Sequence, residues 1–147
     1  MLVDNMKTLL GSSVSLYIKA ANFHWNVEGP DFPEYHEFFG EYYADVYGTI
    51  DTIAEYIRAL DSYTPASLKR FQELSVIPDQ TMQQPPMGMF QELFNDNATM
   101  LAFLNSTFDV ATGERQQGIA NFIAERIDAH QKHQWMIRSI LKSTASL

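Results

Sequence analysis

Residues 22–36 read NFHWNVEGPDFPEYH, and this stretch contains the end of one predicted helix and the start of the next. A helical pattern reaches about Val27, and the Glu-Gly-Pro sequence at 28–30 ends it because glycine and proline both disfavour continuation of a helix. Asp31 then stands at a capping position, Pro33 suits a first helical turn, and Glu34 completes the spacing of a capping box. The stretch therefore predicts the tip of a helical hairpin.

Both arms of this hairpin have apolar residues at spacings of three and four, the pattern of helices that bury one face. The first arm ends at about Val27, and the second runs from Asp31 to near Leu60. The pattern of the first arm consists of Leu10, Val14, Tyr17, Ala21 and His24. The pattern of the second arm consists of Phe39, Tyr43, Tyr47, Ile50, Ala54 and Ile57.

Residues 61–86 interrupt the helical pattern and hold four of the six prolines. Within this region, Thr64-Pro65 predicts the start of a short helix, ASLKRFQEL, which ends before Pro78. A third long helix, a tight turn at Gly113 and a fourth helix from about Glu114 to Lys142 follow. The third helix carries Phe90, Leu93, Asn97, Leu101, Leu104 and Phe108 on one face, and the fourth carries Ile119, Ile123, Ile127, Ile137 and Leu141.

Two helical hairpins joined by one long crossover predict an all-α fold. The expected architecture is a ferritin-like four-helix bundle with a short helix in the crossover between helices 2 and 3. A bundle with short loops would not need a connection of 26 residues, the length of 61–86. We expect residues 1–147 to form a single domain.

The composition excludes several classes of protein. Hydrophobic residues make up 46% and charged residues 19%, which is typical of a globular protein rather than a disordered one. The absence of cysteine excludes disulfides and thiolate metal sites and favours a cytoplasmic protein. We expect no signal peptide and no membrane span, because no apolar run approaches the roughly 18 residues that a span needs. A net charge of −8 predicts repulsion from DNA and from anionic membranes.

Four residues in the first hairpin could bind a metal ion. They are His24, His36, Asp51 and Glu55, and the two carboxylates lie one helical turn apart on the same face. Imidazole and carboxylate groups together suit ferrous iron, and also zinc or manganese. Each residue alone has a simpler explanation, because single histidines on half-apolar faces are commonly structural and paired carboxylates commonly face solvent. The same holds for His130 and His133, which are three residues apart and could share a metal but are more simply read as exposed helix residues.

The spacing of the four candidates argues against a site within one chain. His36 and Asp51 are 15 residues apart on one predicted helix, which corresponds to roughly 22 Å of helix rise. If the four residues form a site, a second subunit must supply half of it, and a two-fold pairing would create two equivalent sites. A conventional ferritin site within one bundle uses Glu-x-x-His, and no glutamate stands three residues before any of the four histidines.

The stretch NFHWNVEGPDF, the His36-Glu37 pair, DTIAE at 51–55 and KHQWMIRSIL near the C-terminus together resemble the Dps family. These DNA-protection-during-starvation proteins, or mini-ferritins, form hollow cages of twelve subunits that oxidise iron between two-fold related subunits, typically with hydrogen peroxide, and store ferric mineral. The resemblance implies that His24 and His36 come from one subunit and that Asp51 and Glu55 come from its partner. It also implies that Trp25 and Trp135 lie close to the site, and that Glu37 is a carboxylate near which mineral begins to form.

The sequence departs from this family at two places. One helical turn after the second histidine the family often has an aspartate, and here that position is Gly40. Early in the last helix, where the family commonly has aspartates that line pores, the sequence reads GERQQGIANF. Two alternatives to a ferroxidase therefore stay open: a shell without activity, whose metal site binds zinc or nothing, and a DNA-compacting protein. Direct DNA binding is not expected, because neither end of the chain has a lysine-rich tail.

Overall fold

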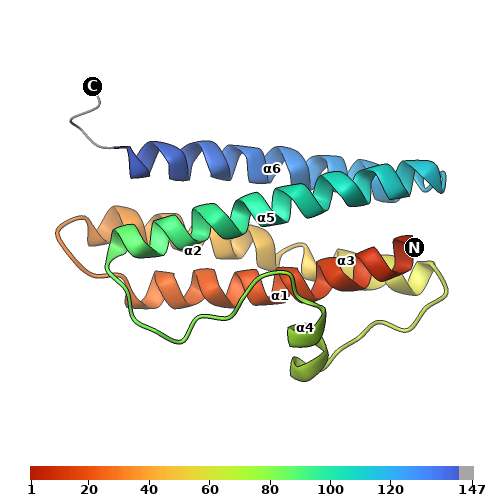
Figure 1. The fold of residues 1–147 in the computed structure, drawn as a ribbon, viewed down its shortest axis with the longest axis horizontal. Coiled ribbons are helices and arrows are strands. Elements are labelled where there is room, and N and C mark those ends of the chain that lie inside the picture. Colours follow the sequence, from red (N-terminus) through yellow and green to blue (C-terminus); the bar gives the residue numbers. More distant parts are fainter. Residues whose placement is uncertain (143–147) are drawn as a thin grey trace.

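The computed structural model describes residues 1–142, and all regular secondary structure in that part of the chain is α-helical (Figure 1). It confirms the predicted ferritin-like four-helix bundle with a short helix in the long crossover. The two hairpins pack side by side, and the crossover passes along the outside of the first one (Figure 1). The helices are α1 (Leu2–Asn26), α2 (Phe32–Tyr47), α3 (Ile50–Ala59), α4 (Leu68–Leu74), α5 (Pro86–Gly113) and α6 (Gln117–Leu141).

The second predicted helix is divided into two, which the sequence pattern did not indicate. α2 ends at Tyr47, and α3 begins at Ile50 after a turn at Gly48 and Thr49. The Thr49 hydroxyl donates a hydrogen bond to the Val46 carbonyl at 2.7 Å, so the side chain competes with the regular backbone ladder. A glycine followed by such a threonine is a common cause of a helix kink.

Near the tip of the first hairpin, aromatic rings of three helices pack together in the core of the bundle. Phe39 of α2 lies between Phe23 of α1, with ring centroids 5.5 Å apart, and Phe90 of α5, at 4.5 Å. All three side chains are buried. Tyr47, which the sequence pattern placed on a buried stripe, is instead 59% exposed because it lies at the break between α2 and α3.

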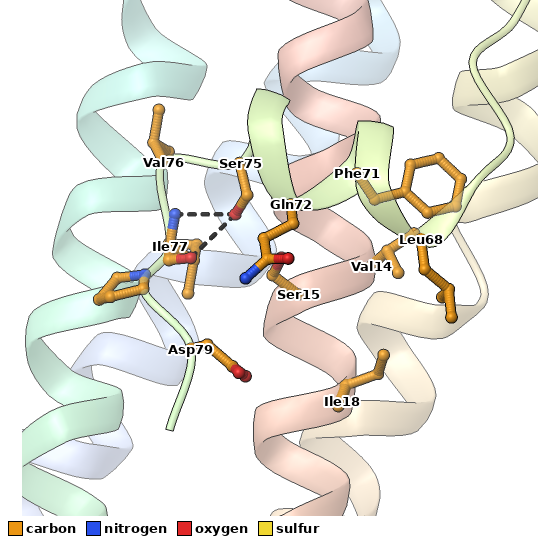
Figure 2. A pocket seen from close by; sticks show the side chains of 11 residues that line it. Val14, Ser15, Ile18, Leu68, Phe71, Gln72, Ser75, Val76, Ile77 and Asp79 are labelled. Carbon is orange, nitrogen blue, oxygen red and sulfur yellow. Dashed lines mark hydrogen bonds between the residues drawn. The ribbon is translucent and has the colours of Figure 1, made fainter. Parts of the chain in front are cut away.

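The crossover is fixed to the first hairpin through α4. This helix begins at Leu68 rather than directly after Thr64-Pro65, and the Ser67 side chain caps it by accepting a hydrogen bond from the Arg70 amide at 3.2 Å. α4 packs tightly on α1 at Gly11, where an added Cβ atom would lie 2.8 Å from the Phe71 carbonyl oxygen. A groove remains beside this contact, lined by Val14 and other side chains of α1 and the crossover (Figure 2).

Other helix ends differ slightly from the predictions. Asp31 is at the N-cap of α2 as expected, but its side chain makes no capping hydrogen bond. The α5–α6 turn uses Arg115, with φ of 59°, as its left-handed residue, so Gly113 is still helical and α6 begins at Gln117 instead of Glu114. Within residues 1–142, no helix combines the length and the apolar character that crossing a membrane requires. Residues 143–147, part of the end that lacks a lysine-rich tail, lie outside the described part of the chain.

Candidate metal centre

His24 and His36 lie against each other at the tip of the first hairpin, as the sequence predicts. Their ring centroids are 3.8 Å apart and the ring planes are inclined by only 12°. Phe32 stacks near the His36 ring at 4.9 Å, and the Tyr43 ring lies 5.4 Å from the His24 ring. Both imidazoles are half-buried, so the surrounding aromatic groups restrict their rotation while one edge stays accessible.

Each imidazole is held by the backbone carbonyl of the other histidine. His24 Nδ1 lies 2.5 Å from the His36 oxygen, and His36 Nδ1 lies 2.6 Å from the His24 oxygen. A carbonyl oxygen can only accept a hydrogen bond, so both Nδ1 atoms must carry the proton and donate. In the neutral form of an imidazole with this tautomer, Nε2 has a free lone pair. A hydrogen bond from Nδ1 to a carbonyl is the usual arrangement around a metal-binding histidine, because it fixes both tautomer and orientation.

Asp51 and Glu55 lie on α3, away from the two histidines, and both are exposed. The antiparallel register of the hairpin follows from two contacts: Tyr17 with Tyr47, whose rings are 5.2 Å apart, and His24 with Gly40. By this register Asp51 is level with about residue 13 of α1, so roughly 16 Å of helix rise separates it from His24. Over residues 1–142, no group of three or more His, Asp or Glu side chains is close enough to hold one metal ion.

The remaining predicted site residues are placed on the surface. Trp25 directly follows His24 and is 69% exposed, and Glu37 directly follows His36 and is also exposed. Trp135 is 57% exposed on α6, whose most extensive contact with another helix is with α5. Trp25 and Glu37 are thus neighbours of the two histidines in the sequence, and the roles of Trp25, Glu37 and Trp135 near the site stay predictions.

His130 and His133 are not exposed helix residues, so that expectation was wrong. His133 Nε2 lies 2.8 Å from an Asp45 carboxylate oxygen, and Arg126 donates two hydrogen bonds to the same carboxylate at 3.0 and 2.7 Å. Burial by itself raises the pKa of Asp45, but the hydrogen bonds from His133 and Arg126 outweigh it and hold the pKa well below its ordinary value. This cluster ties α2 to α6.

His130 belongs to a second network, buried at the centre of the bundle. Its Nδ1 donates to Asn97 Oδ1 at 2.7 Å, and the buried Tyr42 hydroxyl donates to the same oxygen at 2.9 Å. The Asn97 amide donates to Gln134 Oε1 at 2.7 Å. Burial lowers the pKa of His130 well below its usual value, and the nearby Arg126 lowers it further, so the imidazole is neutral. Asn97 was the available sequence signal, as a polar residue on an otherwise apolar stripe.

A third cluster joins α1 to α5. The Lys19 ammonium group is buried and lies 2.7 Å from both Glu92 and Asp96. Gln80 and Gln84 of the crossover also donate to Glu92, at 2.6 and 2.9 Å. Among the described residues no buried side-chain nitrogen or oxygen lacks a hydrogen-bond partner, so these clusters are complete polar networks that hold the bundle together.

Comparison with known proteins agrees with this fold. The model of the ferritin-like domain family matches residues 3–147. The chain is 33% identical to the DNA protection during starvation protein of Brevibacillus brevis, over 88% of this chain and 87% of that protein, and 32% identical to DNA protection during starvation protein 2 of Bacillus anthracis, over 86% of each. The crystal structure of a Dps protein from Bacillus brevis superimposes with a TM-score of 0.92 at 30% identity and covers 96% of this chain and 95% of that one. The chain therefore belongs to the Dps family, the mini-ferritins among ferritin-like proteins.

Proposed function

We propose that this protein stores and detoxifies iron by oxidising ferrous ions at sites shared between two subunits. In each site, His24 and His36 of one subunit and the partner subunit's Asp51 and Glu55 bind the substrate iron. Two ferrous ions supply one electron each to hydrogen peroxide, whose O–O bond breaks to give two hydroxide ions, and the ferric product is kept in a homododecameric cage. The observation that carries the proposal is the histidine pair with both Nδ1 atoms engaged and both Nε2 atoms available.

The position of the carboxylates supports a shared site. Asp51 and Glu55 are exposed on one face of α3, and neither has an ion pair with a cation in the described part of the chain. Two carboxylates and two imidazoles form a donor set that suits ferrous iron, and each half of this set lies on a different part of the hairpin. One chain alone supplies an incomplete site, and a second copy in antiparallel orientation completes it.

The surface of α1 between the two half-sites offers a place for that second copy. Ile18 lies midway along α1 between the level of His24 and the level of Asp51, and it is 44% exposed. Leu68, at 78% exposed, lines the neighbouring groove between α1 and α4 together with Ile18 (Figure 2). A two-fold axis close to Ile18 covers this apolar surface and brings His24 to the level of the partner subunit's Asp51.

Subunit mixing tests the shared site directly. We expect His24→Ala and Asp51→Ala cages each to lose ferrous oxidation, measured by stopped-flow absorbance with peroxide and with oxygen in parallel. In a mixed dimer of the two variants, the substituted His24 of one subunit and the substituted Asp51 of the other belong to the same site. The second site of that dimer has all four native ligands. Cages reassembled from the two inactive variants are therefore expected to recover part of the activity.

The controls separate this result from its alternatives. Thr52→Ala is an exposed neighbour of Asp51 on α3 and is expected to keep the wild-type rate. Remixing each variant with itself should restore no activity. If reassembly is confirmed by mass and mixed cages stay inactive, the shared site is wrong. A wild-type protein that binds zinc but does not oxidise iron would instead favour the shell without activity, and a shift of plasmid DNA at about 100 mM salt would favour DNA compaction.

A further inference from the structure

The His24 ring occupies space that only a glycine at position 40 leaves free. Built on Gly40, an ideal Cβ atom would lie 2.8 Å from His24 Cε1 and 2.9 Å from His24 Nδ1. Such distances are far shorter than ordinary van der Waals contact, so the imidazole lies directly on the backbone of α2. Gly40 does not face a turn and needs no unusual backbone conformation, because it is in the middle of α2.

This contact explains how His24 reaches its hydrogen-bond partner. In an α-helix the carbonyl of residue 36 accepts the amide of residue 40, so the oxygen that His24 Nδ1 contacts at 2.5 Å lies beside the Gly40 backbone. Any side chain at position 40 begins with a Cβ atom on the path of the imidazole. The hydrogen bond that fixes the tautomer of His24, and the stacking of its ring on His36, both depend on the missing side chain.

We propose that Gly40 is a positioning residue that orients His24 and limits the metal site to one ion, an inference that rests on the proposed function. Gly40 leaves room for the His24 ring. Because glycine has no side chain, position 40 also provides no carboxylate ligand. α2 therefore contributes only the His36 imidazole to this site, and the complete site has two nitrogen and two oxygen donors. Such a four-donor set accommodates one divalent ion, zinc or cobalt as well as ferrous iron, rather than a pair of ions bridged by several carboxylates.

A thermal-unfolding cycle tests the contact without any metal. Replacing a helical glycine by alanine ordinarily stabilises a helix. We expect Gly40→Ala to lower Tm, because the new methyl group displaces His24, whereas Gly118→Ala on α6, where an added Cβ meets no atom within 4 Å, keeps or raises Tm. In the His24→Ala background, Gly40→Ala should no longer lower Tm. A Gly40→Ala variant that is more stable than wild type overturns the proposal, and so does a double variant that fails to fold.

Metal binding tests the consequence for the site. Isothermal calorimetry with Zn²⁺ or Co²⁺ alone is expected to give one tight ion per chain for wild type and for Gly118→Ala, and affinity weaker by about 10-fold or more for Gly40→Ala. Two tight ions per chain that both depend on His24 overturn the single-ion site, and unchanged affinity in Gly40→Ala overturns the role of Gly40. If the His24→Ala variant binds the metal as tightly as wild type does, the proposed shared site is wrong. The unfolding cycle then still decides whether Gly40 positions His24.

Discussion

The cluster of Asp45, Arg126 and His133 is expected to contribute substantially to stability, and Asp45→Asn tests it. The substitution keeps the shape of the side chain but removes the negative charge of the carboxylate. That carboxylate accepts two hydrogen bonds from Arg126 and one from His133. Removing one partner of a fully buried ion pair costs about 3–5 kcal/mol, and an exposed pair is worth about 0–1 kcal/mol. The Arg126 side chain is 11% exposed and that of Asp45 33%, so we expect a loss of about 2 kcal/mol.

Urea unfolding monitored by circular dichroism, at one fixed protein concentration because the subunits associate, measures this loss. The matched control is Glu73→Gln, which breaks an exposed pair with Arg70 of similar length, 2.8 Å, and is expected to change stability by less than about 0.5 kcal/mol. Because the pKa of Asp45 is lowered in the folded state, its contribution is complete above about pH 4 and disappears as the pH falls further. Equal effects of the two substitutions at pH 7 would refute the reasoning.

Three further predictions follow from other parts of the structure. Lys19→Met leaves Glu92 and Asp96 facing each other without a cation and should cost about 3 kcal/mol or more in urea unfolding, whereas a change within 0.5 kcal/mol contradicts the buried triad. The pKa of His130 is lowered by burial, so the unfolded chain binds more protons below about pH 6.5. Stability should therefore fall as the pH drops from 6.5 to 5, and His130→Gln should flatten this slope. Ile18→Glu places a charge on the proposed two-fold surface and should give smaller particles in light scattering, and intact cages would place that surface elsewhere.

Several features of the fold were predictable because their causes are local. The helical hairpin follows from residues 22–36, where an apolar stripe, a Gly-Pro turn and a first-turn proline succeed one another. The crossover helix follows from its prolines and its spacing. The break between α2 and α3 was missed because one glycine in a strong apolar pattern does not by itself end a helix, and the hydrogen bond of Thr49 that accompanies the break is visible only in three dimensions.

The candidate site was predictable only in part. Residue types and spacing indicated His24 and His36 as neighbours at one end of the hairpin; the structure confirms this and shows in addition that their rings stack. The assignment of Asp51 and Glu55 to a partner subunit stays a prediction. The reciprocal hydrogen bonds to backbone carbonyls, and the fit of the His24 ring on Gly40, could not be read from spacing because they depend on the rotation of each ring.

The sequence by itself determined the two helical hairpins, their order and the chemical types of the candidate ligands, because helix formation depends on residues three and four apart. Only the tertiary structure decided which polar residues are buried partners. Asp45 and His133 are 88 residues apart, and Lys19 and Asp96 are 77 apart, so no local pattern connects them. The packing of α1 on α5 and of α2 on α6 brings these groups out of water, and once buried each charged or polar group must find a partner in the protein.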